Sequence, residues 1–171
     1  MQLKPSNATI DTSAKKTRVV KIKVRKQIAM LGGALIDYRF FATNHLHGWR
    51  DVKVAEIVAI CDMNEERPNL VGDQFGIERR YVDPVQLFAN KKLDFVDIAT
   101  TAPSHRALVE LSAKHGVAII CQKPLASMLG DAQAMVQACA KAQAPLMVHE
   151  NCAPMKQVNW CAMLLKREQV L

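Results

Sequence analysis

The sequence lacks any apolar run that approaches the roughly 18 to 20 residues needed to cross a bilayer. It also lacks an apolar signal core near its N-terminus. Nothing in it therefore points to insertion or secretion, and we expect a cytoplasmic protein. Half of the 171 residues are hydrophobic, which is enough for one core of ordinary size.

Closely spaced cysteine pairs are also missing. The five cysteines are an odd number, and no Cys-x-x-Cys pair occurs among Cys61, Cys121, Cys139, Cys152 and Cys161. This spacing argues against both a disulfide framework and a zinc site, so we expect no metal. Cys61 and Cys121 end apolar runs, where a free thiol acts as a small buried hydrophobe.

The net charge of +7 comes from one end of the chain. Residues 1–26 carry eight Lys or Arg against Asp11 alone, and the rest is balanced. A basic arm can contact nucleic acid or anionic lipid, but here no aromatics interleave with the charges. We therefore expect a solvated extension over residues 1–29, with neither nucleic acid nor membrane as partner. Val20 to Arg25 alternates apolar and cationic residues, which predicts an exposed edge strand.

Strand and helix patterns alternate along the rest of the chain. The expected strands are 30–36, 54–61, 95–100, 117–121 and 145–149, and the expected helices are 42–50, 64–75, 84–90, 104–115, 129–142 and 156–167. This order predicts an α/β fold with a doubly wound, mostly parallel sheet of the Rossmann type. Pro68 and Gly72 predict a broken or shortened second helix. Ser104 is the expected N-cap of its helix, and Gly116 is expected to follow the end of that helix.

A glycine-rich turn after the first strand, the usual cradle for a pyrophosphate, is missing as well. Gly32 and Gly33 lie inside the first apolar run, so the turn is expected at residues 37–42. Asp62 then follows the turn start by 25 positions, near the spacing of an acidic residue that binds a ribose.

Polar residues follow two other expected strands. Thr100 ends one of them, and the next expected strand runs into Gln122 and Lys123. Because ligands collect at the carboxyl ends of parallel strands, Lys123 is expected to belong to a site.

A series of short motifs gives this pattern a family likeness. They are His45, Val-Ala-Ile-Cys-Asp at 58–62, Phe-Gly-Ile at 75–77, Tyr-Val-Asp at 81–83, Val-Asp-Ile-Ala-Thr at 96–100, His105, Gln-Lys-Pro at 122–124 and Val-His-Glu-Asn at 148–151. In this order they resemble the N-terminal half of the Gfo/Idh/MocA oxidoreductases, which are sugar and polyol dehydrogenases using NAD or NADP. Residues 44–49 and 121–124 resemble the D-apiose dehydrogenase subgroup.

The resemblance implies a dinucleotide-binding domain over residues 30–151 and roles for individual residues. Lys123 matches the lysine of the Glu-Lys-Pro signature, which contacts the nicotinamide ribose and helps hold the substrate, and it is the expected catalytic residue. Gln122 replaces the usual glutamate. Asp62 is implied as a ribose ligand, which favours NAD over NADP. The other implied cofactor-binding residues are Phe40, Phe41, Thr100, His105, Gln122, Lys123 and Asn151.

The chain departs from the family pattern in two respects. Asp37 and Arg39 stand where the family has its first two fingerprint glycines, so weakened dinucleotide binding is expected. The family's C-terminal α+β domain has no counterpart in this sequence, in which residues 152–171 are expected to begin the crossover helix. We therefore expect little or no turnover from this chain alone. The alternative is a non-catalytic Rossmann domain that acts as a binding or partner protein, with self-association through exposed apolar surface.

Overall fold

The computed structural model describes residues 31–36, 42–90 and 92–149. In chain order these form β1 (Leu31–Ile36), α1 (Ala42–Arg50), β2 (Ala55–Cys61), α2 (Glu66–Phe75), β3 (Arg79–Tyr81), α3 (Pro84–Asn90), β4 (Phe95–Ile98), α4 (Ala102–Lys114), β5 (Ala118–Gln122), α5 (Leu129–Ala142) and β6 (Leu146–His149). The expected edge strand at 20–25, the helix at 156–167 and residues 37–41 of the turn expected at 37–42 lie outside the described residues, and Ala42 begins α1.

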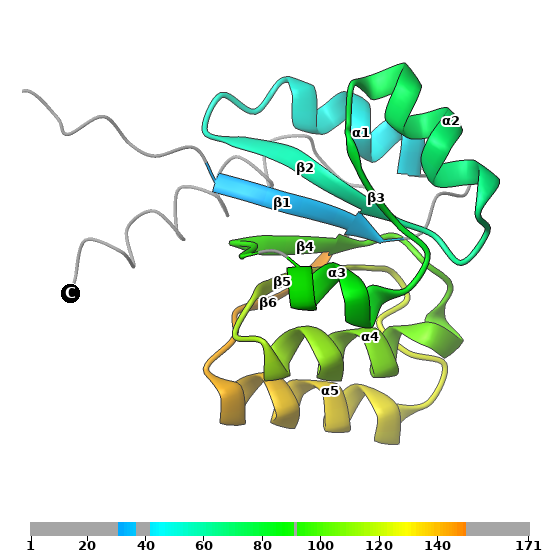
Figure 1. Cartoon of the computed structure of the whole chain (residues 1–171). Coiled ribbons are helices and arrows are strands. Elements are labelled where there is room, and N and C mark those ends of the chain that lie inside the picture. Colours follow the sequence, from blue (N-terminus) through cyan, green and yellow to red (C-terminus); the bar gives the residue numbers. More distant parts are fainter. Residues whose placement is uncertain (1–30, 37–41, 91, 150–171) are drawn as a thin grey trace, which may run out of the picture.

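One parallel sheet organises the described chain (Figure 1), with the strand order β3-β2-β1-β4-β5-β6. The direction of the strand order reverses between β1 and β4. Ile36 pairs with both Cys61 and Ile98, and Ile98 pairs with Cys121. The carboxyl ends of the four central strands therefore lie level at one edge of the sheet. The predicted doubly wound α/β fold is confirmed.

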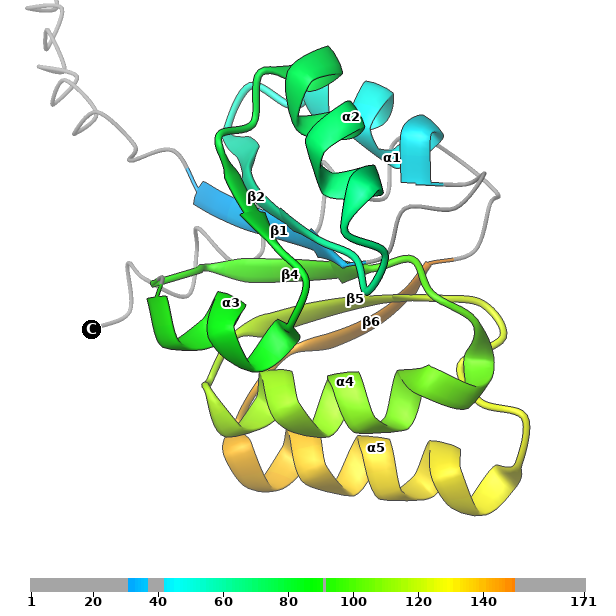
Figure 2. The same ribbon diagram turned by 45° about the vertical axis from the view of Figure 1, so that its right-hand side comes forward.

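Helices cover both faces of the sheet: α1 and α2 lie on one face, and α3, α4 and α5 lie on the other (Figure 2). The core divides in the same way. Under α3, α4 and α5 the buried side chains include Leu87, Val109 and Met135. Under α1 and α2 they include Trp49 and Val71 in two smaller clusters. Buried strands with apolar side chains on both faces fit the near-continuous apolar runs of the sequence.

The glycine pair of β1 serves packing. A Cβ atom on Gly33 would overlap the ring of Phe95, which lies beside it on β4. The same ring packs against Trp49, with ring centroids 4.6 Å apart. Gly33 therefore admits a large aromatic residue into the centre of the sheet, and the prediction that this glycine pair lies inside the strand is confirmed.

Of two sequence predictions about helices, the N-cap at Ser104 was wrong, and the broken or shortened helix at 64–75 held only in part, since α2 begins two residues later, at Glu66, but is not broken. The helix α2 runs unbroken from Glu66 to Phe75, because Pro68 falls in its first turn, where a backbone N–H has no intrahelical acceptor in any case. The helix α4 begins at Ala102 with Thr101 in the N-cap position, and Ser104 instead donates its hydroxyl to the Thr101 carbonyl at 2.8 Å. As predicted, Gly116 follows the end of α4, with a φ of 67°.

The short strand β3 was not predicted. Its sequence, Arg-Arg-Tyr, has none of the apolar run that marks the other strands. It pairs only with β2 at the edge of the sheet, where polar side chains remain exposed to water. Among the helices of the described residues, none combines the length and apolarity that crossing a membrane requires.

Candidate functional site

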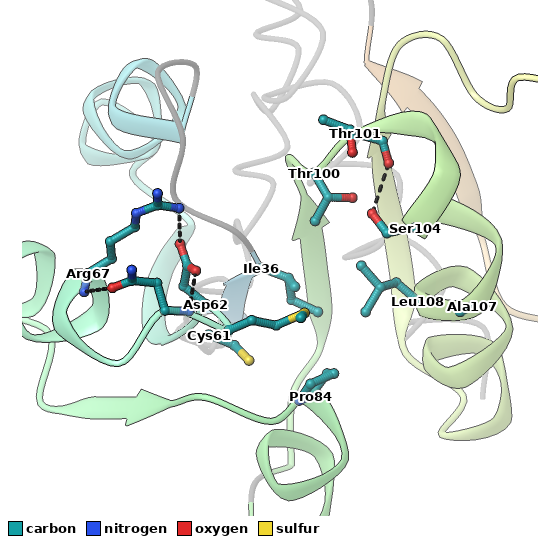
Figure 3. Close-up of a pocket in the computed structure, with 12 residues that line it drawn as sticks. Ile36, Cys61, Asp62, Arg67, Pro84, Thr100, Thr101, Ser104, Ala107 and Leu108 are labelled. Carbon is teal, nitrogen blue, oxygen red and sulfur yellow. Dashed lines mark hydrogen bonds and ion pairs between the residues drawn. The ribbon is translucent and has the colours of Figure 1, made fainter.

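A pocket of about 650 Å³ opens where the strand order reverses (Figure 3). It lies at the carboxyl ends of β1, β2 and β4, and its wall includes Ile36, Asp62 and Thr100. Residues of α2 and α4, among them Arg67 and Leu108, complete it. In open α/β sheets this reversal point is the place where ligands bind. The topology therefore places two of the predicted cofactor-binding residues, Asp62 and Thr100, in one pocket.

Asp62 is held in place by the loop that follows β2. Its side chain is only 6% exposed, and Oδ1 accepts the backbone N–H of Asn64 at 2.8 Å. Arg67 Nη1 lies 3.5 Å from Oδ2. Asn64 Oδ1 in turn accepts the N–H groups at the start of α2, from Glu66 at 3.0 Å and Arg67 at 3.3 Å. The carboxylate thus has a fixed direction at the pocket wall (Figure 3).

Thr100 stands opposite Asp62, at the end of β4. Its Oγ1 atom is buried and has no hydrogen-bond partner in the part of the chain that the structure describes. A buried hydroxyl without a partner costs free energy, so a position of this kind suits hydrogen bonding to a ligand. The carboxylate and the hydroxyl together fit the hydroxyl-rich ribose of a dinucleotide.

His105 lies behind the wall of the pocket and is not one of its lining residues. Its side chain is 0% exposed, and its ring nitrogens lie 3.0 Å from the Leu125 and Thr100 carbonyl oxygens. The ring therefore ties the loop after β4 to the loop after β5. In this place the ring supports the pocket wall, and a direct contact of His105 with the cofactor stays a prediction.

Gln122 and Lys123 lie at the end of β5, two strands along the sheet from β1. Lys123 is exposed, whereas Gln122 is buried. Gln122 Oε1 accepts the backbone N–H of Lys123 at 2.7 Å. Neither residue lines the pocket that contains Asp62 and Thr100. The described residues thus bring the predicted site residues to one edge of the sheet but divide them between two places along it.

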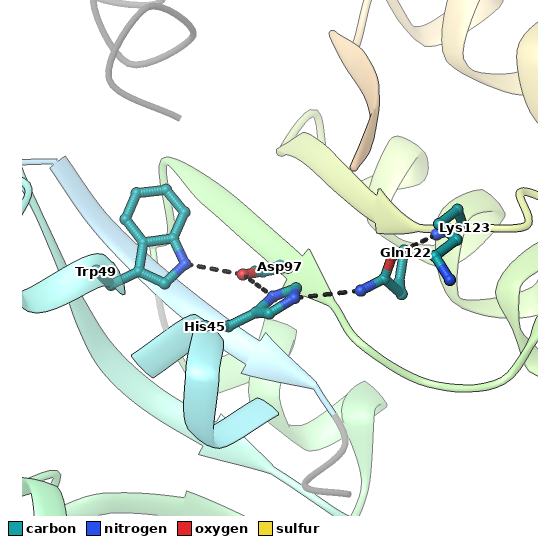
Figure 4. A network of polar contacts seen from close by, with 5 residues as sticks. All are labelled: His45, Trp49, Asp97, Gln122 and Lys123. Carbon is teal, nitrogen blue, oxygen red and sulfur yellow. Dashed lines mark hydrogen bonds and ion pairs between the residues drawn. The ribbon is translucent and has the colours of Figure 1, made fainter. Parts of the chain in front are cut away.

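A buried polar network connects α1 with β4 and β5 (Figure 4). Asp97 Oδ2 accepts the indole N–H of Trp49 at 2.8 Å and lies 2.9 Å from His45 Nδ1. His45 Nε2 lies 3.3 Å from Gln122 Nε2. The His149 ring on β6 also packs edge-on against His45, with centroids 4.6 Å apart. Side chains from three strands, β4, β5 and β6, therefore meet the imidazole of α1.

The electrostatics of His45 reflect two opposing effects. Burial is the largest and lowers its pKa, but the hydrogen bond and the negative charge of Asp97 outweigh it. The pKa of His45 is consequently raised above its ordinary value. Asp97 itself is 0% exposed. This network was not predicted as part of the site, although an aspartate inside the apolar run Phe-Val-Asp-Ile is a signal that a buried partner exists.

The cysteine beside the pocket does not offer a reactive thiolate. Burial, followed by the charges of Asp83 and Asp62, raises the pKa of Cys61 to about 12. Within the described ranges, no three His, Cys, Asp or Glu side chains come together as metal ligands. The described residues at this edge therefore supply the Asp62 carboxylate, hydroxyls, side-chain amides, the Arg67 guanidinium and the exposed side chain of Lys123.

The remaining predicted residues lie outside the described part of the chain. These are Phe40 and Phe41 of the expected turn, Asn151 after β6, and the glycine replacements Asp37 and Arg39. What the described residues provide fits a dinucleotide. Asp62 and Thr100 suit a ribose, and Lys123 supplies a positive charge at a neighbouring strand end.

Known proteins are similar to this chain in sequence and in fold. D-Apiose dehydrogenase of Rhizobium rhizogenes is 63% identical over 121 residues, which are 71% of this chain and 35% of that protein. D-Apiose dehydrogenase of Paraburkholderia graminis is 56% identical over 146 residues, or 85% of this chain and 36% of that protein. The chain thus spans little more than a third of the length of these curated relatives.

Solved structures give the same picture. An oxidoreductase from Agrobacterium radiobacter, in complex with NAD+, L-tartaric acid and magnesium, matches with a TM-score of 0.71 and 61% identity, over 72% of this chain and 36% of that one. A probable dehydrogenase from Thermotoga maritima matches with a TM-score of 0.66 and 28% identity, over 69% and 35%. The family model described as "Oxidoreductase family, NAD-binding Rossmann fold" matches residues 26–150. The chain therefore belongs to the Gfo/Idh/MocA oxidoreductase family and comprises its NAD-binding Rossmann domain.

Proposed function

We propose that this domain binds NAD at the carboxyl edge of its sheet and serves hydride transfer to or from a sugar or polyol. The observation that carries the proposal is the pocket at the reversal of the strand order, with Asp62 and Thr100 at the ends of β2 and β4. The dinucleotide supplies the hydride carrier, while the protein binds and orients it. The relatives named D-apiose dehydrogenase support a sugar as the substrate class.

The preference for NAD over NADP rests on Asp62. A carboxylate suits the two hydroxyls of an adenosine ribose as a hydrogen-bond acceptor, and its charge repels a 2′-phosphate. Arg67 is the nearby cation that would favour the phosphate, but its guanidinium points to Asp62 at 3.5 Å. We therefore assign Asp62 as the ribose ligand and expect NADH to bind more tightly than NADPH.

Lys123 is the residue that we assign to the reacting end. Its ammonium group is exposed at the end of β5, and in that place it can stabilise negative charge on a substrate oxygen during hydride transfer. The proposal extends to residues 37–42, where Asp37 and Arg39 replace glycines and are expected to weaken binding of the pyrophosphate. Turnover by this chain alone is expected to be small, and self-association and a cytoplasmic location stay predictions.

The experiment that tests the proposal is titration of NADH and NADPH into the purified chain, followed by nicotinamide fluorescence. We expect saturable NADH binding that weakens roughly 10- to 150-fold in Asp62→Ala, since a hydrogen bond to a charged group contributes roughly 1.5 to 3 kcal/mol. Asp73→Asn is the matched control, because Asp73 is an exposed α2 carboxylate that pairs with Arg80 and does not line the pocket.

The Asp37→Gly/Arg39→Gly double variant tests the turn separately. Tighter binding by this variant would locate the weakness in the turn. A folded chain that binds neither dinucleotide, with or without the two glycines, would overturn the proposal and favour the alternative of a partner protein.

A further inference from the structure

The side-chain amide of Gln122 bridges two groups, and its orientation follows from one of them. The backbone N–H of Lys123 lies 2.7 Å from Gln122 Oε1. A backbone N–H can only donate, so this contact requires the oxygen of the amide. The orientation is therefore fixed without reference to the histidine, and the NH₂ group of Gln122 faces His45 Nε2 at 3.3 Å.

This orientation determines where His45 carries its proton. Facing an NH₂ group, Nε2 must accept, so the ring proton lies on Nδ1. There it donates to Asp97 Oδ2 at 2.9 Å, and the indole N–H of Trp49 holds the same oxygen at 2.8 Å. With this tautomer every contact from Trp49 through Asp97 and His45 to Gln122 joins one donor to one acceptor (Figure 4).

We propose that His45 is a positioning residue for Lys123. The neutral ring holds the amide of Gln122, and that amide holds the backbone N–H of Lys123 at the end of β5. Asp97 and Trp49 act one step further back, by fixing the tautomer and direction of the ring. The inference rests on the function proposed for Lys123, and it links α1, the helix after the expected pyrophosphate turn, to the reacting end of the site.

Protonation of His45 breaks this arrangement. A charged ring carries a proton on Nε2 as well, so two donors face each other across the contact with Gln122. The amide must then turn its oxygen to the ring, which removes it from the Lys123 N–H. The ring is faced by the carboxylate of Asp97 from β4, the imidazole of His149 from β6 and the uncharged amide of Gln122 from β5. Because Asp97 raises the pKa of His45, the loss begins above the ordinary value of about 6.5.

Nuclear magnetic resonance of the ¹⁵N-labelled chain tests the proposal without any cofactor. At pH 9 we expect the His45 ring as the Nδ1–H tautomer and a protected Lys123 amide. As the pH falls, exchange of that amide should accelerate roughly three- to tenfold relative to intrinsic rates, in step with the titration of His45. Two results would overturn the proposal. One is an Nε2–H tautomer of His45 at pH 9, and the other is a Lys123 amide exchange rate that does not change as His45 titrates.

Three variants separate positioning from general damage to the fold. His45→Ala should lose the protection of the Lys123 amide at every pH. His45→Gln should restore it without pH dependence, because its amide can donate to Asp97 and accept from Gln122. Gln122→Glu should move the titration of His45 upward by roughly one unit, because its carboxylate accepts from the charged ring. Equal exchange at Lys123 in the alanine and glutamine variants would contradict a positioning role.

The same samples distinguish this inference from the function on which it rests. Loss of NADH binding with a pH-linked Lys123 amide would leave the positioning role intact and remove the proposed function. Normal NADH binding, with exchange of the Lys123 amide that does not follow the titration of His45, would support the proposed function and remove the positioning role. If His45→Ala fails to fold, the pH series on the unmodified chain still decides the question.

Discussion

The two faces of the sheet hold their buried polar groups in different ways. Under α3, α4 and α5, His105 and Ser112 hydrogen-bond to backbone carbonyls in a large apolar cluster. Under α1 and α2, His45, Trp49 and Asp97 bond to each other's side chains. In the first arrangement a side chain bonds to the backbone of a loop or of its own helix. The second joins elements that are far apart in the chain, and it contains a group that titrates.

The difference teaches where stability and function reside in this domain. Apolar packing is non-directional and does not itself depend on pH, so the α3–α5 face supplies stability mainly through the apolar area that it buries. A buried network of side chains costs desolvation and works only in one geometry, so it fixes positions rather than adding free energy. The network also contacts Gln122, whose side chain accepts the backbone N–H of Lys123.

The largest expected effect breaks the apolar face. Ile119 on β5 is 0% exposed, and its replacement Ile119→Ala leaves a cavity. Such substitutions lower the free energy of unfolding by about 2 to 5 kcal/mol. Urea unfolding should give the same loss at pH 6 and pH 9, because no titrating group takes part. A loss of unfolding free energy that differed between pH 6 and pH 9 would contradict the proposed difference between the two faces.

A smaller effect, and a pH-dependent one, is expected on the other face. Asp97→Asn removes the charge beside His45 and should cost about 1 to 3 kcal/mol. Since Asp97 raises the pKa of His45 in the folded chain, its contribution is full below about 6.5 and is lost as the pH rises through the folded value. Urea unfolding should therefore show a larger loss at pH 6 than at pH 9. A larger loss at pH 9 would contradict the assigned direction.

Two glycines give a smaller contrast of opposite sign. A Cβ atom on Gly48 meets nothing within 4 Å, so Gly48→Ala in α1 should raise stability by about 0.5 to 1 kcal/mol. Gly33→Ala is the control, because its Cβ would overlap Phe95 and should lower stability by about 1 to 3 kcal/mol. Thermal unfolding measures both. A stabilised Gly33→Ala would mean that Phe95 can move aside at little cost.

The smallest expected effect is the absence of a reaction. Burial, with nearby charges, raises the pKa of both Cys61 and Cys121 to about 12. At pH 8 only about one molecule in 10⁴ carries either thiolate, so both should resist a thiol reagent in the folded chain and react after unfolding. Mass mapping of the labelled cysteines checks this. Rapid labelling of Cys121 in the folded state would show that the apolar face opens.

Much of the fold could be predicted because the central strands have a recognisable sequence pattern. Near-continuous apolar runs mark β1, β2, β4 and β5, and their boundaries were predicted to within two residues. The edge strand β3 was not predicted because a strand at the edge of a sheet needs few apolar side chains. The unbroken α2 was missed because Pro68 was weighed as a helix breaker without regard to its place in the first turn.

The site was predictable in its location but only partly in its contacts. Asp62 and Thr100 were predicted at strand ends, and the structure places both in one pocket, while their binding of a cofactor stays a prediction. The link from His45 to Gln122 joins residues 77 positions apart, and it could not be found from local pattern. The inward direction of His105 depends in the same way on the tertiary fold, because the two carbonyl oxygens that lie 3.0 Å from its ring nitrogens belong to the loops after β4 and β5.

The position of β1 has a consequence for how the chain acquires its structure. The first described strand to leave a ribosome is central in the finished sheet, between β2 and β4. Its pairing with β2 involves residues about two dozen positions apart, whereas its pairing with β4 must await Phe95 and its neighbours. Until then one long side of an apolar strand has no partner, and such edges invite pairing with other chains. Each later strand on this side of the sheet covers the edge of the one before it, β4 that of β1 and β5 that of β4, so the apolar edge is closed stepwise as synthesis proceeds.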